Sequence, residues 1–555
     1  MLFRSSAVTQ SNLFRCYRTL GLFAGDRAAS CCAVGNALHL LVPTNNSFIS
    51  YNITHKLDFL YRSVDFEEKV EAVHSYGYKA IVVTAHMVVF ERSSGIFEKL
   101  GIDGTISSSL LFGEHIIVTT ESRMHVIAIK DGTIFKTINI PCASPKLFHP
   151  REYMNKVLLI SGNQCFLMNI NTEKTLFTFT FPAPVTAIAQ SPDVDVHAVA
   201  LETGEVILFD LRQNKKIGSF FVANKPSSVC FVNGLPGGDL FLIVGDVVGR
   251  ITVISIKSGI VIGTLFHHVA RVHTLISIPN ELHFFSVGDD NAIRMYVIDT
   301  KSGSLVPVLV RQRCGHPRKP HYLKFSNYQL ATASPDGSVR LSSIFNPMLT
   351  QELSQKVSKK ARRNGVSVEE YKRGRVNCLD VNLRYALVHD SMVTTHDGDH
   401  RAFTWNTTKY TINQNALMGT VVSKNKGQGK HSGAMKREVQ DNEKSIDTCC
   451  CFSHCGNFVL IGNSLGTIDR FSVQSGEHKL FYLKHTAQIT GLACDSNNKY
   501  VVSAANDGKV LLWDFETARV LATLLSVSVP ITHFVFNNEN DICTVVDAEN
   551  TVSII

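Results

Sequence analysis

Short runs of apolar residues recur along the chain, and a tight polar turn separates each run from the next. Ala80–Thr84 and Met87–Phe90 show the arrangement, as do Ile116–Thr119 and His125–Ile129. Short runs rich in Val, Ile and Phe that are bounded by Gly, Asp and Asn are typical of β-strands joined by turns. The pattern therefore predicts an all-β chain of antiparallel strand–turn–strand units.

The turns that separate these runs recur at a regular interval of roughly 41 to 47 residues, which is the period of four-stranded units repeated around a ring. The clearest turns are Thr203-Gly204, Val248-Gly249, Asp290-Asn291 and Asp336-Gly337. Twelve units can be placed, and the twelfth runs from Ile531 to Ile555 without a fourth strand. A single β-propeller has roughly four to eight blades, so the pattern predicts two rings.

One unit near the C-terminus carries a recognisable set of side chains. Asp507-Gly508 is a turn that needs positive φ, which Gly supplies, and Val510–Leu512 leads to Trp513. With His485 and Ser503, this unit resembles a WD40 repeat, in which four such residues form a hydrogen-bonded tetrad. The resemblance implies a structural role for His485, Ser503, Asp507 and Trp513. Because Trp513 and Trp405 are the only two Trp in the chain, most repeats are expected to be degenerate.

The units predict a division of the chain into three parts. We expect a first seven-bladed β-propeller with closing strands over residues 1–345, a basic linker over 346–375, and a partial second β-propeller over 376–555. The second ring is expected to lack blades at its C-terminal side. An open ring exposes edge strands, so either the sequence is a piece of a longer chain or another element closes the ring.

The net charge of +8 is unevenly distributed. Lys356–Arg375 holds eight Lys or Arg and two Glu, and Lys424–Arg437 holds five Lys or Arg and no acid. These two segments carry more than the whole net charge, so the repeated units themselves are slightly acidic. No run approaches 18 apolar residues and no long apolar core follows Met1–Ser6, so neither a membrane span nor a signal peptide is expected. A mitochondrial presequence stays open, because no acid precedes Asp26.

The first basic segment has three possible interpretations. It could neutralise phosphates in a salt-dependent contact with RNA, serve as a nuclear import signal, or be a solvated spacer. Tyr371 is the only aromatic residue among its charges, so base stacking is not indicated. The candidate residues are Lys359, Lys360, Arg362, Arg363, Lys372, Arg373 and Arg375.

Several longer stretches resemble one family, the twin-propeller WD-repeat subunits of the UTP-B module of the U3 small-subunit processome. The matching stretches follow the same order along almost the whole chain: Tyr17–Leu22, His149–Leu159, Val194–Val199, Gly288–Tyr296, Cys455–Phe458 and Val473–His478. The family also has a helical C-terminal domain to which nothing here corresponds, so that domain's functions do not transfer.

The resemblance implies a function in ribosome assembly. It implies a nucleolar, non-catalytic scaffold in pre-18S rRNA processing, with other UTP-B subunits and U3 snoRNP proteins as partners and contact with pre-rRNA or U3 snoRNA through the basic insertions. The alternative is a general WD40 adaptor, such as a ubiquitin-ligase substrate receptor or a trafficking scaffold. A steady-state cytoplasmic signal would favour that alternative.

Other candidate chemistry has a stronger structural explanation. His396, Asp397, Asp399 and His400 could ligate a metal, but Asp399 precedes Trp405 by the same offset as Asp507 precedes Trp513, which makes it a turn residue. Cys449–Cys451 with His454 and Cys455 lacks a second Cys pair at zinc-ligand spacing. Gly427–Ser432 lacks the spacing of a phosphate loop, and no nucleophile elbow is found. We therefore expect no metal, no cofactor and no enzyme activity, with thiols reduced in the nucleus or cytosol.

Overall fold

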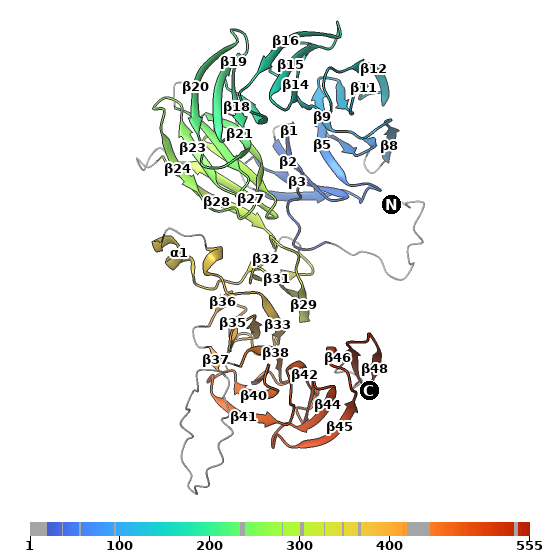
Figure 1. The fold of residues 1–555 in the computed structure, drawn as a ribbon, viewed down its shortest axis with the longest axis vertical. Coiled ribbons are helices and arrows are strands. Elements are labelled where there is room, and N and C mark those ends of the chain that lie inside the picture. Colours follow the sequence, from blue (N-terminus) through green and yellow to red (C-terminus); the bar gives the residue numbers. More distant parts are fainter. Residues whose placement is uncertain are drawn as a thin grey trace. The chain divides into compact units, whose positions relative to one another are not determined.

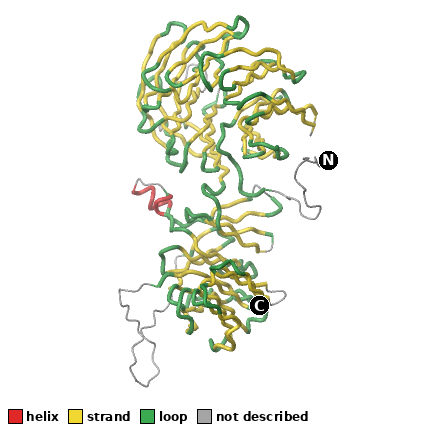
Figure 2. The backbone as a smooth tube through the Cα atoms, turned by 45° about the vertical axis from the view of Figure 1, so that its right-hand side comes forward, coloured by secondary structure: helices red, strands yellow, loops and turns green. Residues whose placement is uncertain are grey.

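A computed structural model describes the chain as two compact units, Met1–Pro317 (unit 1) and Arg318–Ile555 (unit 2). The described residues are 19–35, 37–54, 57–93, 96–233, 239–279, 281–299, 305–326, 328–346, 349–364, 368–413, 416–418, 445–537 and 542–555. Figure 2 shows that strands dominate both units and that helix is confined to one short segment among these residues. The expected all-β fold with two β-propeller domains is confirmed.

The described residues of unit 1 form seven four-stranded antiparallel sheets, each made of four consecutive strands (Figure 1). The first four sheets contain β1 Ser30–Val34, β2 Ala37–Thr44, β3 Ser47–Asn52, β4 Asp58–Arg62; β5 Val70–Tyr76, β6 Lys79–Thr84, β7 Met87–Ser93, β8 Ile96–Gly101; β9 Ser108–Phe112, β10 His115–Thr119, β11 Arg123–Ala128, β12 Thr133–Asn139; β13 Lys146–Phe148, β14 Lys156–Ser161, β15 Gln164–Asn169 and β16 Lys174–Thr180. The other three contain β17 Val185–Gln190, β18 Val196–Leu201, β19 Glu205–Asp210, β20 Lys215–Phe221; β21 Pro226–Asn233, β22 Leu240–Asp246, β23 Ile251–Ser255, β24 Val261–Leu265; β25 Val272–Ser277, β26 His283–Gly288, β27 Ala292–Ile298 and β28 Pro307–Cys314.

Unit 2 has five sheets in its described residues, the last with three strands. They contain β29 Tyr322–Ser326, β30 Gln329–Ala333, β31 Val339–Ser343, β32 Thr350–Glu352; β33 Val376–Val381, β34 Met392–His396, β35 Arg401–Asn406, β36 Thr411–Ile412, β37 Leu417–Met418; β38 Asp447–Phe452, β39 Phe458–Asn463, β40 Thr467–Ser472, β41 His478–Leu483; β42 Ile489–Cys494, β43 Tyr500–Ala505, β44 Lys509–Asp514, β45 Val520–Ser526; β46 Ile531–Asn537, β47 Ile542–Asp547 and β48 Val552–Ile554. Between β32 and β33 lie α1 Ser358–Asn364 and the 3₁₀ turn Glu369–Tyr371.

Burial falls from the second and third strands of a sheet to the fourth. In the sheet β13–β16, Val157–Ile160 are all buried, whereas most of β16 is exposed. The second and third strands are therefore the near-continuous apolar runs visible in the sequence, because neighbouring sheets cover both of their faces. The fourth strand is a solvated edge, which explains its more polar sequence.

The first strands of neighbouring sheets contact one another and are joined by hydroxyl hydrogen bonds. Ser227 Oγ, at the start of β21, donates to Gly245 O of its own sheet and to Val272 O of the next, at 3.2 and 2.7 Å. Thr448 Oγ1 of β38 does the same with Gly462 O and Ile489 O, at 3.1 and 2.7 Å. A β-bulge follows the first residue of both β21 and β38, and it turns these hydroxyls toward the neighbouring sheet.

Within its described residues, unit 1 closes on itself without exchanging a strand between its ends. Residues of β2 and β3, such as Leu40 and Tyr51, share one buried cluster with Phe285 and Met295 of β26 and β27. Asn291 fastens the chain that precedes β1, because its Oδ1 accepts from Phe23 N and Ala24 N at 2.7 and 3.0 Å. Its Nδ2 donates to Gly21 O at 2.8 Å. Asn tolerates the positive φ of 55° at this turn better than most residues.

The division between the units falls at Pro317, earlier than the expected boundary at residue 345. The sheet β29–β32, which we expected to supply closing strands for the first ring, instead shares a buried cluster with β33–β35 of unit 2. Because β1–β4 already packs against β25–β28 in unit 1, no position is left there for an eighth sheet. Hydrophobic periodicity locates a sheet in the sequence but does not say which neighbour it packs against.

Candidate nucleic-acid interface

The four tetrad residues proposed from the sequence form one hydrogen-bonded chain in the sheet β42–β45. Trp513 Nε1 donates to Ser503 Oγ at 2.7 Å, and His485 Nε2 lies 2.8 Å from the same oxygen. His485 Nδ1 lies 3.0 Å from Asp507 Oδ2. All four are buried or nearly so, and burial lowers the pKa of His485 despite the adjacent carboxylate. The tetrad holds the turn at Asp507 against β43 and β44. Its polar atoms bond to one another, so none is directed at a ligand.

A second tetrad, which the sequence reasoning missed, lies in the sheet β25–β28. His268 Nδ1 is 2.8 Å from Asp290 Oδ1, and His268 Nε2 is 2.6 Å from Ser286 Oγ. The sequence separations, 22 and 18 residues, equal those of His485 from Asp507 and Ser503. Tyr296 stands where the other tetrad has Trp, which hid the repeat, but these separations would have identified it.

Arg294 makes this second tetrad more strongly charged than the first. Its Nη1 lies 3.0 Å from Asp290 Oδ2. Burial would raise the pKa of Asp290, but the bond from His268 and the charge of Arg294 lower it to about 2. Burial and the charge of Arg294 lower the pKa of His268. These groups pair with one another inside the sheet, with only Arg294 Nε left without a partner among the described residues, so we assign them to stability.

Among the seven candidate basic residues, Lys372 and Arg373 form a structural pair and four others are exposed. Lys372 Nζ lies 2.7 Å from Glu352 Oε1, and its side chain is only 8% exposed. Arg373 lies flat on Phe403, with its guanidinium carbon 3.5 Å from the ring centroid, and its Nη1 is 3.8 Å from Asp399 Oδ2. These two cations are therefore committed to packing within unit 2.

The backbone of this segment is docked as firmly as its side chains. Arg373 N donates to the Gln355 side chain at 2.9 Å, and Gln355 Nε2 donates to Gly337 O, also at 2.9 Å. A Cβ on Gly337 would lie 2.0 Å from Arg373 O, so only glycine permits this approach. The end of the expected linker is thus an ordered part of unit 2.

The exposed set lies on and after α1. Lys359, Lys360 and Arg363 are exposed, and α1 also contains Arg362. Ala361 is buried and anchors the helix. Lys360 Nζ is 5.1 Å from the Tyr371 ring centroid. The Lys360 ammonium group therefore already covers one face of the Tyr371 ring. Arg375 is also exposed. The second basic segment, Lys424–Arg437, lies outside the described residues, as does Gly427–Ser432.

Two of the four candidate metal ligands, His396 and Asp399, already pair with other groups. Nδ1 of the buried His396 donates to Gly374 O at 2.8 Å, and Asp399 pairs with Arg401 at 3.0 Å. Among the residues that the structure describes, no group of three or more His, Cys, Asp or Glu is arranged to hold a metal ion.

The cysteine thiols of unit 2 are buried or already interact with other protein groups. Every cysteine in the described ranges is a free thiol. Burial raises the pKa of Cys449, Cys450 and Cys451. A hydrogen bond with the Cys450 thiol, together with one from Tyr322, outweighs burial and lowers the pKa of Cys378 to about 7. His454 accepts a hydrogen bond from Arg384 and does not join the thiols.

Asp447 is an acid in an apolar position that sequence reasoning did not single out. It begins β38, at the register where other sheets place Val272, Val376 or Ile489. Asp447 is only 2% exposed, and its Oδ2 has no hydrogen-bond partner among the described residues. Burial, with the nearby Asp469 and Asp399, raises the pKa of Asp447 to about 8. The carboxyl is therefore largely protonated at neutral pH.

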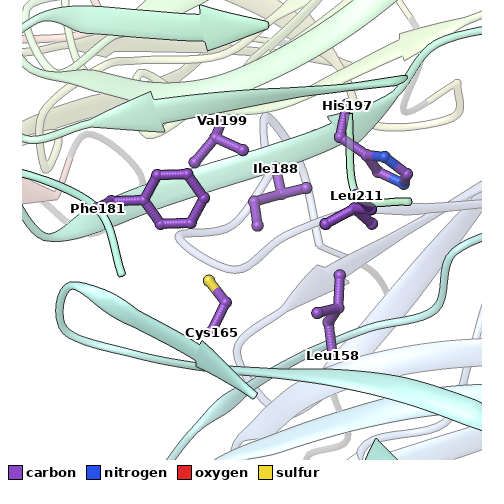
Figure 3. Close-up of a pocket in the computed structure, with 7 residues that line it drawn as sticks. All are labelled: Leu158, Cys165, Phe181, Ile188, His197, Val199 and Leu211. Carbon is purple, nitrogen blue, oxygen red and sulfur yellow. The ribbon is translucent and has the colours of Figure 1, made fainter. Parts of the chain in front are cut away.

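The described residues offer no large enclosed pocket among the best-formed cavities. One cavity between the sheets β13–β16 and β17–β20 has a volume of about 10 Å³ and is lined by apolar side chains and His197 (Figure 3). That is the space of about one water, and its lining is unsuited to a substrate. Among the described residues, no helix is both long and apolar enough to span a bilayer.

Two family models match the chain and together cover most of it. The WDR36/Utp21 first beta-propeller matches residues 40–299, and the WDR36/Utp21 second beta-propeller domain matches residues 320–555. The chain belongs to the WDR36/Utp21 family. The limits of the two matches agree with the division of the structure at Pro317.

Curated members of the WDR36/Utp21 family match along nearly the whole chain. The U3 small nucleolar RNA-associated protein 21 homolog of Schizosaccharomyces pombe is 26% identical over 91% of this chain and 56% of its own length. U3 small nucleolar RNA-associated protein 21 of Saccharomyces cerevisiae is 25% identical over 91% and 53%. WD repeat-containing protein 36 of Homo sapiens is 25% identical over 94% and 58%. The chain thus spans about half the length of these relatives.

Proposed function

We propose that this chain is a non-catalytic scaffold of the small-subunit processome that acts with the U3 snoRNP in pre-18S rRNA processing. The observation that carries the proposal is the collinear match of both β-propellers to relatives, two of which are named as U3 small nucleolar RNA-associated proteins. A rigid ring of sheets offers loops and edges to several partners at once, which suits a scaffold. The proposed location is the nucleolus, and the proposed partners are U3 snoRNP proteins and other UTP-B subunits.

The exposed cations on α1 are the proposed RNA contact of this scaffold. Lys359, Lys360 and Arg363 lie on one short helix anchored by Ala361, and no carboxylate lies within ion-pair distance of them in the described part of the chain. Such a group attracts phosphate. The attraction falls as salt rises, because binding releases counterions from the nucleic acid and that release is less favourable in concentrated salt. Lys372 and Arg373 are excluded from the contact, because they pair within unit 2.

Recovery of U3 snoRNA on the tagged full chain tests the proposed scaffold function. At low salt we expect enrichment of U3 snoRNA over a mitochondrial RNA of similar abundance, together with nucleolar localisation of the tagged chain. Cytoplasmic localisation without U3 enrichment would contradict the proposal and favour the general WD40 adaptor.

A second experiment tests the RNA contact separately. In the triple variant Lys359→Ala, Lys360→Ala, Arg363→Ala, the slope of log affinity for purified U3 snoRNA against log salt should become shallower by about 2, since each single-strand phosphate contact contributes about 0.7. The matched control replaces Lys130, Lys174 and Lys215, three exposed lysines of unit 1, by Ala. Equal slopes in the two variants would remove the RNA contact. A loss of nuclear accumulation with an unchanged slope would assign the helix to import.

A further inference from the structure

The loop between β33 and β34 is longer than the corresponding loops of the next two sheets. Ten residues, Asn382–Ser391, separate the paired Val381 and Met392. Six residues separate the equivalent pairs in the sheets β38–β41 and β42–β45. The additional residues are not needed to connect the two strands, so they call for another explanation.

The loop displays aliphatic side chains to solvent. Leu387 is 92% exposed and the adjacent Val388 is 72% exposed, whereas Tyr385 is 45% exposed. Leu387 is the most exposed large apolar side chain among the described residues. Isolated exposed apolar residues are common on protein surfaces, but two adjacent ones at the tip of an inserted loop are a surface that a partner can bury.

Hydrogen bonds hold this loop in one conformation. Asn382 Nδ2 donates to Ser453 O and His454 O at 3.2 Å each, which ties the loop to its counterpart in the next sheet. Arg384 N donates to Asn382 Oδ1 at 3.1 Å, and Arg384 Nη2 donates to His454 Nε2 at 2.7 Å.

The tip and the end of the loop are also fixed. Val388 N and His389 N donate to Tyr385 O at 2.9 and 3.1 Å, forming a helical turn. Asp390 accepts from Thr404 Oγ1 and Asn413 Nδ2 at 2.6 and 2.8 Å. A Cβ on Gly456 would lie 3.3 Å from Asn382 Nδ2, so glycine there leaves room for the loop. A loop ordered in advance loses little conformational freedom on binding.

The exposed charge of the loop is positive. Arg384 is exposed, and no carboxylate lies within ion-pair distance of it among the residues that the structure describes. The one acid of the loop, Asp390, is buried and already bound to Thr404 and Asn413. A complementary surface therefore has an apolar hollow with a carboxylate at its edge.

We propose that Asn382–Asp390 is a preformed docking loop that inserts Leu387 and Val388 into an apolar, carboxylate-edged pocket of another protein of the U3 particle. The proposal rests on the proposed function and adds the kind of partner to it. An aliphatic anchor seated in a pocket, with paired polar groups around its rim, is an arrangement on which protein–protein interfaces are built. RNA is the less suitable occupant, because it offers no comparable apolar hollow to Leu387 and Val388.

The test compares tagged full-length variants for recovery of U3 snoRNA from cell extract at increasing salt. L387S/V388S should lower recovery about tenfold at high salt, where the electrostatic contribution of α1 is screened. The matched control L465S/L521S alters two exposed leucines elsewhere in unit 2, 43% and 51% exposed, and should leave recovery unchanged. R384E should lower recovery about threefold and R384K less. Thermal melting should be equal for all variants, because the altered side chains are exposed.

The outcomes separate the two proposals. Recovery by L387S/V388S equal to that of the unaltered chain would overturn the docking loop alone. Failure of the unaltered chain to recover U3 snoRNA would overturn the proposed function and the loop with it. Affinity for purified U3 snoRNA should not change in L387S/V388S; a matching fall there would show that the loop contacts RNA and would overturn a protein partner.

Discussion

The two units are built from the same kind of antiparallel sheet. Their first strands differ in how much of their apolar surface a neighbouring sheet covers. In unit 1, β25 is mostly buried, because the seven sheets of that unit form a closed series. In unit 2, β29 exposes Leu323 and Phe325 at 60% each, and β46 exposes Val535 at 68%. The sequences of these strands are similarly apolar. The comparison teaches that the presence of a neighbouring sheet, more than the residues of the strand itself, decides which apolar side chains are covered.

The two tryptophans give a direct way to test the comparison. Trp405 and Trp513 are the only Trp of the chain, and both are buried in unit 2. Tryptophan fluorescence therefore reports on unit 2, whereas far-UV circular dichroism reports on both units. We expect unit 2 to unfold at a lower urea concentration than unit 1. The fluorescence transition should therefore coincide with the first part of the dichroism transition and precede the second part, which reports unit 1. Coincident transitions would contradict a difference in stability between the units.

The largest expected single-residue effect is at Trp513. Trp513→Ala should lower the free energy of unfolding of unit 2 by about 3–5 kcal/mol, because it removes a large buried side chain and leaves Ser503 without its donor. Trp405 fluorescence in urea measures the change. Trp513→Phe is the milder variant, and Tyr296→Ala is the matched control in unit 1. That control should shift the dichroism transition and leave the Trp405 transition in place.

Asp447 should make unit 2, but not unit 1, less stable as pH rises. Its folded pKa of about 8 lies above the unfolded value of about 3.9, so the folded state binds more protons between these values. Stability is then lost on the order of 1 kcal/mol per pH unit from about pH 4 to about pH 8 and levels off above. Trp fluorescence in urea at several pH values measures it.

Two variants at this position sharpen the comparison. Asp447→Val restores the residue type found at Val272 of unit 1 and should stabilise unit 2 by about 2–4 kcal/mol at pH 8, where the charged form is most costly. Asp447→Asn keeps the shape and should flatten the pH dependence. An unchanged pH slope in both variants would show that Asp447 titrates normally in the folded state.

The smallest of these effects is expected at the closure of unit 1. Asn291→Ala should lower the stability of unit 1 by about 1–3 kcal/mol, because Phe23 N, Ala24 N and Gly21 O lose their partner. Asn291→Gly keeps the positive φ accessible and separates the hydrogen bonds from the backbone conformation. Hydrogen exchange at Phe23 and Ala24 reports the change. Protection equal to that of the unaltered chain would mean that the buried cluster alone closes the unit.

Much of this architecture could be predicted from the sequence, because strand and turn signals are local. The repeated turns and the tetrad at His485 follow from residue types and spacings within one sheet. The membership of β29–β32 could not be predicted, since packing between sheets leaves no periodic signal. The second tetrad was hidden by Tyr296, and nothing in the sequence around Asp447 shows that its carboxyl is buried.

The candidate interface was predicted only in part. The sequence identified the basic segment, but charge alone does not distinguish Lys359, which faces solvent, from Lys372, which pairs with Glu352. The docking loop was not singled out, because two adjacent apolar residues in a sequence do not show whether a sheet covers them. Only their exposure in the structure shows that no sheet covers them.

The hydroxyls that join neighbouring first strands have a mechanical consequence. Thr448 bonds to its own sheet and to the next, so separating the two sheets must break its bond to Ile489 O. Under tension applied to its ends, unit 2 should therefore lengthen in steps of one sheet as such bonds break one after another. Unit 1 should resist until its closure at Asn291 gives way.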